Sequence, residues 1–137
     1  MDAIKIEGLT IKYKDVVAVD NLNLSISQGE LFSLLGVNGA GKTTTIKMLS
    51  CLTQPTSGDA FLNGKSICKD TAEVKSLIAV SPQETAVAPG LTVWENLELI
   101  CGVYGFSKEK KGIKIAELTE LLGLEAVINK KAGKLSG

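Results

Sequence analysis

The stretch that decides the fold is Gly36-Val37-Asn38-Gly39-Ala40-Gly41-Lys42-Thr43. It fits the pattern G-x-x-x-x-G-K-[ST] at every fixed position. Such a loop points several backbone N–H groups at a phosphate chain, and its glycines leave the room that side chains would fill. We therefore predict a nucleoside-triphosphate site, in which Lys42 reaches the β- and γ-phosphates and the Thr43 hydroxyl binds Mg²⁺.

The segments on either side of this loop favour the same interpretation. Residues 31–35 form a short apolar run, which predicts a central parallel strand covered on both faces. Residues 42–50 contain no glycine or proline and place Ile46 and Leu49 on one face, so we expect a helix there. The positive end of that helix would add to the attraction for phosphate. The alternative is a chance glycine-rich turn, which would not require a strand before it and a helix after it.

Composition limits the class of protein. The chain has 137 residues, of which 45% are hydrophobic, and its 15 basic and 15 acidic side chains give no net charge. These values predict one globular domain with no general attraction for nucleic acid or for an anionic membrane surface. No apolar run is long enough to span a bilayer, and the opening Met1-Asp2-Ala3 lacks the basic region of a signal peptide. We therefore expect a cytosolic protein.

Cysteine and histidine limit the available chemistry. The three cysteines, Cys51, Cys68 and Cys101, lack the close paired spacing of a zinc or redox motif. We predict that they are reduced core residues. Because the sequence contains no histidine, this chain offers no histidine general base, metal ligand or pH switch.

The first part of the chain has strand patterns around the loop. Apolar residues nearly alternate over 4–13 and again over 17–26, with a break at Lys14-Asp15, which predicts two half-buried antiparallel strands. Asn63-Gly64 predicts a hairpin between residues 59–62 and 65–67. A short helix is expected within residues 71–77, followed by a buried strand at 78–80.

The second part of the chain has helical patterns. Thr92 and Glu95 fit a capping box at the start of a helix that carries Trp94. A further helix is expected from near Ser107 to Gly123. Its predicted apolar positions are Ile113, Ala116, Leu118, Leu121 and Leu122. The lysines at 108, 110, 111 and 114 could suit an anionic partner, but we interpret them as a solvated helix face.

Several stretches at matching separations resemble the ATP-binding subunits of ABC transporters. The resemblance runs along the whole chain. Ile78-Ala79-Val80-Ser81-Pro82-Gln83 is similar to the Q-loop of this family, and Gly90-Leu91-Thr92-Val93-Trp94-Glu95-Asn96-Leu97 is similar to the usual continuation. Leu135-Ser136-Gly137 is similar to the opening of the LSGGQ signature. Pro55-Thr56-Ser57-Gly58 and Asn63-Gly64 also fall where family members carry them.

The resemblance implies ATP and Mg²⁺ as ligands and gives roles to single residues. Tyr13 would stack on adenine, although an aromatic at the end of a strand also suits ordinary packing. Gln83 would contact Mg²⁺ or the attacking water, the alternative being a surface glutamine without a role. Lys42 and Gln83 are thus the catalytic candidates, and Thr43 and Gln83 the metal ligands. The residues expected to surround the phosphates are Gly36, Asn38, Gly39, Ala40, Gly41, Lys42, Thr43 and Thr44.

The implied fold is α/β, a P-loop NTPase core of the ABC ATPase type with an antiparallel β subdomain and the start of a helical subdomain. We expect a truncated nucleotide-binding domain, with the β subdomain and P-loop core in residues 1–83 and the helical subdomain in 84–137. Family members carry the Walker B aspartate, the catalytic glutamate and the switch histidine after the signature. The intact subunit is therefore expected to be an ATPase, whereas this chain alone is expected to bind ATP without turnover.

The resemblance also implies partners. Residues 84 to about 104 would meet the coupling helix of a membrane-spanning subunit; Trp94 and Tyr104 fit either that patch or the helix core, and for Trp94 we favour the core. A second ATPase subunit would complete the nucleotide sandwich at the inner face of the cell membrane, with no nucleic acid. We favour an exporter of the drug or antibiotic class. A soluble ABC ATPase of DNA repair or the ribosome, and a nucleotide-binding module without turnover, remain open.

Overall fold

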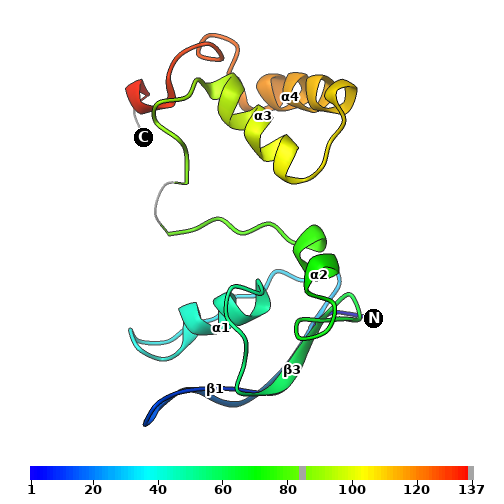
Figure 1. Cartoon of the computed structure of the whole chain (residues 1–137), viewed down its shortest axis with the longest axis vertical. Coiled ribbons are helices and arrows are strands. Elements are labelled where there is room, and N and C mark those ends of the chain that lie inside the picture. Colours follow the sequence, from blue (N-terminus) through cyan, green and yellow to red (C-terminus); the bar gives the residue numbers. More distant parts are fainter. Residues whose placement is uncertain (84–85, 136–137) are drawn as a thin grey trace. The chain divides into compact units, whose positions relative to one another are not determined.

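The computed structural model describes residues 1–83 and 86–135. The chain divides into two compact units, Met1–Val80 and Ser81–Gly137, and Figure 1 labels their helices and the strands β1 and β3. The expected boundary at residues 83 and 84 stays a prediction. The first unit contains β1 (Asp2–Tyr13), β2 (Val16–Ser27), α1 (Lys42–Leu49), β3 (Ser57–Leu62), β4 (Lys65–Ser66) and α2 (Thr71–Leu77). The second contains α3 (Val93–Val103), α4 (Lys108–Leu122) and a 3₁₀ turn, η1 (Ala132–Lys134).

The sheet of the first unit is antiparallel, with the strand order β2-β1-β3-β4. The two strands predicted from alternation are therefore confirmed as the pair β1 and β2. The hairpin between β3 and β4 is confirmed as well. Its turn residues Asn63 and Gly64 have φ angles of 46° and 78°, as a two-residue hairpin turn of type I′ requires.

One face of this sheet forms the core of the first unit. Helices α1 and α2 lie on the same side of the strands (Figure 1) and contribute Met48 and Val74, which are fully buried together with Leu9 of β1. Burial of side chains of this size contributes roughly 1.5–3 kcal/mol each. The buried cluster contains Ile6, Leu9, Ile11, Val19, Met48, Ala60, Leu62, Ile67 and Val74.

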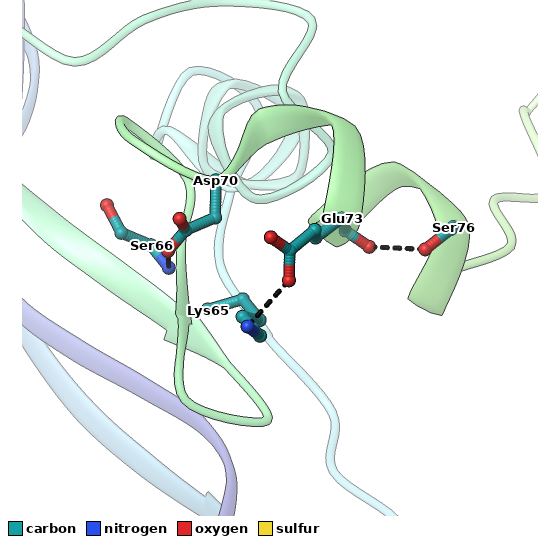
Figure 2. A network of polar contacts seen from close by, with 5 residues as sticks. All are labelled: Lys65, Ser66, Asp70, Glu73 and Ser76. Atoms are coloured by element: carbon teal, nitrogen blue, oxygen red, sulfur yellow. Dashed lines mark hydrogen bonds and ion pairs between the residues drawn. The ribbon is translucent and has the colours of Figure 1, made fainter.

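Polar contacts fix α2 against β4 (Figure 2). The Lys65 ammonium lies 2.6 Å from the Glu73 carboxylate, and the Ser66 N–H donates to the Asp70 carboxylate at 2.9 Å. Within the helix, the Ser76 hydroxyl donates to the Glu73 carbonyl at 2.7 Å. Asp70 stands at the N-cap of α2 without capping it, because its carboxylate accepts from the Ser66 N–H of β4 instead.

The two short strands predicted at residues 31–35 and 78–80 are wrong. Residues 31–35 form no strand, and Leu31 and Leu35 are 98% and 87% exposed. Apolar composition alone does not make a strand, because backbone groups also need a neighbouring strand to bond. Within the described parts of the chain, the sheet pairs other segments. Residues 78–80 likewise lack strand structure, although Ile78 packs partly against the core.

The helix boundaries predicted for the second unit are confirmed. At the start of α3, the Glu95 N–H donates to the Thr92 hydroxyl at 3.1 Å and the Thr92 N–H donates to the Glu95 carboxylate at 3.2 Å. This is the reciprocal capping box expected from the sequence. Helix α4 has Ser107 as its N-cap and ends at Gly123, whose φ of 64° is the left-handed conformation common after helices.

The inward faces of these helices differ from prediction. Trp94 is 40% exposed, so its assignment to the core is wrong; Val93 and Cys101 are the buried residues of α3. In α4 the buried residue is Ile115, whereas the predicted apolar position Ile113 is 58% exposed. Two residues correspond to about 200° around a helix, so Ile113 and Ile115 cannot share one face. The expected apolar positions Ala116, Leu121 and Leu122 are exposed as well, and Leu118 is half-buried.

The cysteines are all free thiols, but only Cys101 is buried. Cys51 is half-buried, and Cys68 is exposed at the end of the β3–β4 hairpin, so the core prediction is wrong for Cys68. Its position in a loop explains the difference. In residues 1–83 and 86–135, no helix combines the length and the apolar character needed to cross a bilayer.

Candidate nucleotide-binding site

The centre of the site is Gly41, the last residue before α1. Its φ is 88°, in the left-handed region. A Cβ at this position would stand 2.5 Å from the carbonyl oxygen of Ala18 and 3.0 Å from a methyl group of Val19, both in β2. No residue with a side chain fits this space without moving backbone. Gly41, at the end of the glycine-rich loop, therefore packs directly against the backbone of β2.

The carbonyl of Gly41 is held by α1. It accepts from the backbone N–H and from the hydroxyl of Thr45, each at 2.8 Å, and Thr45 is only 4% exposed. Sequence reasoning missed this contact, although the four-residue spacing between Gly41 and Thr45 in a predicted helix could have indicated it. Nothing in the sequence indicates the contact of Gly41 with Ala18, because these residues are brought together by the fold.

The N-terminus of α1 suits an anion. Gly41 provides no side chain to cap the helix, and the first turn has no acidic residue. The first N–H groups of any helix lack partners within it and carry a partial positive charge. This end of α1 is therefore suited to bind an anion such as a phosphate group.

Lys42 lies against its own loop. Its ammonium donates to the carbonyl oxygen of Gly36 and, at 3.2 Å, to that of Val37. The Ala40 N–H donates to the Val37 carbonyl at 3.1 Å and closes the loop from within. Phosphate oxygens are stronger acceptors for an ammonium than peptide carbonyls. A phosphate chain at this loop would thus draw Lys42 away from the two carbonyls.

The remaining loop residues are accessible. Asn38, Gly39 and Thr43 are exposed, and Thr44 is half-buried on the first turn of α1. The described residues contain no cluster of three or more His, Cys, Asp or Glu side chains that could hold a metal ion. A Mg²⁺ ion that arrives with a nucleotide does not need such a cluster, because phosphates, waters and a hydroxyl group supply most of its ligands.

Tyr13 stands at the end of β1 and is 49% exposed. Its partner in the sheet register is Val16. Ala18, which contacts Gly41, is two residues further along β2 from Val16, a distance of about 7 Å in a strand. Tyr13 and the end of the glycine-rich loop therefore both lie next to the first residues of β2, within one unit.

A hollow adjoins the loop on the side of β2. It is lined by Ala18, Asp20, Ala40, Gly41, Lys42 and Thr45, together with apolar residues of β2 and of the segment before the loop. Asp20 was not among the predicted site residues. It is an exposed residue and lines the same hollow as Lys42, the lysine expected to bind phosphate.

Gln83 belongs to the second unit. It is exposed, in chain that forms neither helix nor strand. Its predicted role toward the phosphates and Mg²⁺ therefore stays a prediction. Of the predicted signature residues, Leu135 is 37% exposed at the end of the described chain, whereas Ser136 and Gly137 lie outside the described residues.

The chain resembles known proteins along almost its whole length. The family described as ABC transporter matches residues 19–137. ATP-binding cassette sub-family A member 2 from Rattus norvegicus is 40% identical over 99% of this chain. The protein named "Probable multidrug ABC transporter ATP-binding protein YbhF" from Escherichia coli is 35% identical over 96% of this chain. The structure of the dimeric ATP-binding cassette MJ0796, in a post-hydrolysis state bound to ADP and Pi, superimposes over 97% of this chain with a TM-score of 0.78 at 29% identity.

The chain spans only part of each of these proteins: 6% of the rat protein, 23% of the Escherichia coli protein and 63% of the solved cassette. The agreement nevertheless covers both units, from the β1–β2 hairpin through the glycine-rich loop to α4. The family match over residues 19–137 and the identities of the relatives lead to one conclusion. The chain belongs to the ABC transporter family, and its fold is part of the α/β P-loop ATPase domain of that family.

Proposed function

We propose that this chain binds MgATP as part of an ATPase that drives transport across a membrane. The observation that carries the proposal is the arrangement at Gly41. Its left-handed conformation, its contact with Ala18 and its bonds from Thr45 fix the glycine-rich loop at the open N-terminus of α1. This arrangement gives a triphosphate both backbone donors and a neighbouring ammonium.

The proposed roles follow the loop in order. Gly36, Asn38, Gly39, Ala40, Gly41 and Thr44 surround the phosphates, Lys42 neutralises the β- and γ-phosphates, and the Thr43 hydroxyl binds Mg²⁺. Tyr13 stacks on the adenine. Gln83 contacts Mg²⁺ or the attacking water and responds to the γ-phosphate. ATP and Mg²⁺ are the ligands of the site, and Lys42 and Gln83 are its proposed catalytic residues.

The proposed partners are a second ATPase subunit and a membrane-spanning subunit. The dimeric state of the solved cassette, bound to ADP and Pi, supports the first. A surface groove on the second unit supports the membrane-spanning partner, because the groove falls largely within the patch predicted at residues 84–104. It is lined by Leu91, Glu95, Glu98, Leu99, Val103 and Lys111. The multidrug name of the Escherichia coli relative supports export. We place the protein in the cytoplasm at the inner face of the cell membrane.

Calorimetric titration of the chain with MgATP tests this function. The control variant is Lys47→Ala, since Lys47 is an exposed lysine in the last turn of the same helix. Saturable binding by the unmodified chain and by Lys47→Ala, with loss in Lys42→Ala, is the expected result. Phosphate release recorded in parallel should stay negligible for this chain alone. Undiminished binding by Lys42→Ala, or no binding by a folded chain, would refute the proposed site.

A further inference from the structure

The distribution of basic residues along α4 is unfavourable for the stability of the helix. Lys108, Lys110, Lys111 and Lys114 lie in its N-terminal half, and its last turn contains no basic residue. Helices favour acidic residues at the N-terminus and basic residues at the C-terminus, because the N-terminus carries partial positive charge. One surface ion pair, Lys114 with Glu117 at 3.5 Å, offsets little of this cost. Stability of the helix therefore does not explain where these lysines stand.

The lysines produce a local positive charge in a chain without net charge. Residues 103–114 contain these four lysines and the single glutamate Glu109, so four positive charges less one negative charge leave a local charge of +3. Lys108, Lys110 and Lys114 are exposed, and Lys111 is half-buried. Glu117, which pairs with Lys114, and Glu95 and Glu98, which line a groove together with Lys111, offset part of this local charge.

The last residue of α3 and the turn that follows it expose apolar side chains close in sequence to the lysines. Val103 is 73% exposed, Tyr104 44% and Phe106 37%. The turn is well defined, because the Phe106 N–H donates to the Cys101 carbonyl at 3.0 Å and Gly105 has a φ of 73°. Residues 103–114 are here called the basic tip. They expose apolar and aromatic side chains next to the N-terminus of α4, where the lysines stand.

The chemistry of the basic tip fits the surface of an anionic bilayer. Lys108 and Lys111, three residues apart, lie on one face of α4, and Lys110 lies on another, since successive residues turn by about 100° around a helix. Lysines spread over two sides of a helix end suit a surface of many negative headgroups better than a single carboxylate or phosphate group. Every basic residue of the chain is a lysine, which acts as a point charge and not as a two-pronged donor for one anion. Exposed aromatic and aliphatic side chains beside lysines are typical of membrane-surface binding.

We propose that the basic tip docks on a membrane surface rich in anionic lipid, with Phe106 in the headgroup region and Lys108, Lys110 and Lys114 against the lipid phosphates. Both contributions are needed, because apolar burial and electrostatic attraction add in interfacial binding. The docking surface lies in the second unit and uses no residue of the glycine-rich loop. Nucleotide binding and lipid binding can therefore succeed or fail independently.

Flotation of the full chain with vesicles tests the proposal. Vesicles of phosphatidylcholine alone are compared with vesicles that also contain phosphatidylglycerol. We expect binding only to the anionic vesicles and weaker binding as salt is added. The variant carries Lys108→Gln, Lys110→Gln and Lys114→Gln. A lysine near an anionic surface is worth about 1 kcal/mol, or about fivefold in affinity, so this variant should bind on the order of a hundredfold more weakly.

The matched control replaces Lys130, Lys131 and Lys134 by glutamine. It removes the same number of charges from exposed positions of the same unit, and it should bind within about twofold of the unmodified chain by the same estimate. Circular dichroism confirms that both variants fold. Equal loss in the two variants would overturn the proposal, as would equal binding to neutral vesicles. Binding of an acidic peptide such as polyglutamate in place of vesicles would overturn it too, since the partner would then be a protein.

A second measurement tests the apolar side of the tip. Trp94 is the single tryptophan of the chain, so the pair Trp94→Phe and Phe106→Trp moves the fluorescent group into the tip. With brominated anionic lipids, we expect quenching of tryptophan at position 106 and weak quenching of Trp94 in the unmodified chain. Bound protein in which position 106 remains unquenched would overturn the insertion of the tip.

Discussion

The carbonyl oxygen of Ala18 lies 2.5 Å from the point at which a Cβ on Gly41 would stand. We predict that Gly41→Ala loses nucleotide binding and destabilises the first unit. The methyl group would push β2 away from the loop, and the φ of 88° would become strained. Strain of this kind costs about 1–3 kcal/mol. Chemical unfolding monitored by circular dichroism measures the loss of stability, and MgATP titration measures the loss of affinity.

Gly39→Ala separates the two causes. Gly39 has nearly the same φ, 87°, but nothing lies within 4 Å of its Cβ position. Its substitution should therefore cost only the backbone strain and leave β2 in place. If both variants lose the same amount of stability, the contact between Ala18 and Gly41 contributes nothing beyond backbone conformation.

Tyr13 allows a test of base stacking. The Tyr13→Ala variant should weaken ATP binding by about 1–3 kcal/mol, the usual contribution of one aromatic ring stacked on one base. Tyr13→Phe should bind like the unmodified chain, because it keeps the ring. Calorimetric titrations of the three proteins with MgATP make the comparison. Since Tyr13 is 49% exposed, its removal should change the thermal midpoint little, so weak binding by Tyr13→Ala would not reflect unfolding.

The parts of the fold that sequence patterns predicted correctly are those with local causes. Thr92 and Glu95 determine the start of α3 through contacts three residues apart. Asn63-Gly64 determines the β3–β4 turn because both residues tolerate positive φ. The helix after Gly41 was predicted correctly for the same reason, since residues 42–50 contain no helix breaker.

The parts that the sequence did not predict depend on contacts between distant segments. A strand at residues 31–35 would need a neighbouring strand for its backbone hydrogen bonds, and an apolar sequence does not show whether such a neighbour is present. The contact of Ala18 with Gly41 joins β2 to the end of the glycine-rich loop, two segments that are separated in the sequence. The net charge of a chain does not show how its charges are distributed. A net charge of zero therefore led us to expect no attraction for anionic membranes. The four lysines of α4 are visible in the sequence, where we interpret them as a solvated helix face; the structure adds the exposed aromatic side chain of Phe106 in the turn before them.

Asn96 should prove important for the second unit. Its side-chain oxygen accepts from the Ala88 N–H at 2.9 Å, and its amide donates to the carbonyls of Ala88 and Thr92 at 3.1 and 2.9 Å. We predict that Asn96→Ala destabilises this unit by roughly 1–3 kcal/mol, since the half-buried Ala88 N–H loses its acceptor and the carbonyls of Ala88 and Thr92 each lose one donor. Hydrogen exchange should show a faster rate at the Ala88 amide.

Two further variants make the Asn96 test specific. Asn96→Asp keeps the acceptor for Ala88 but loses both donors and sets a negative charge beside the carbonyl of Thr92, so it should not restore stability. Asn129→Ala removes an exposed asparagine of the same unit and should change stability by less than about 0.5 kcal/mol. Stability of Asn96→Ala equal to that of Asn129→Ala would show that the side-chain bonds of Asn96 are dispensable.

The pair Lys65 and Glu73 predicts a pH effect. The bond to the Glu73 carboxylate, and then its negative charge, raise the pKa of Lys65 above its ordinary value of 10.5. Because folding favours the protonated amine, the contribution of this pair to stability is complete below pH 10.5 and is lost as the pH rises through the higher pKa of the folded state. Glu73→Gln should lower the pKa of Lys65 toward its ordinary value, as followed by NMR titration of the lysine side chain, although the charge of Asp70 still acts to raise it. Lys5, whose pKa is raised in the same way by Glu7, should keep its raised value in that variant. An unchanged titration of Lys65 in Glu73→Gln would mean that the contact drawn in Figure 2 does not persist in solution.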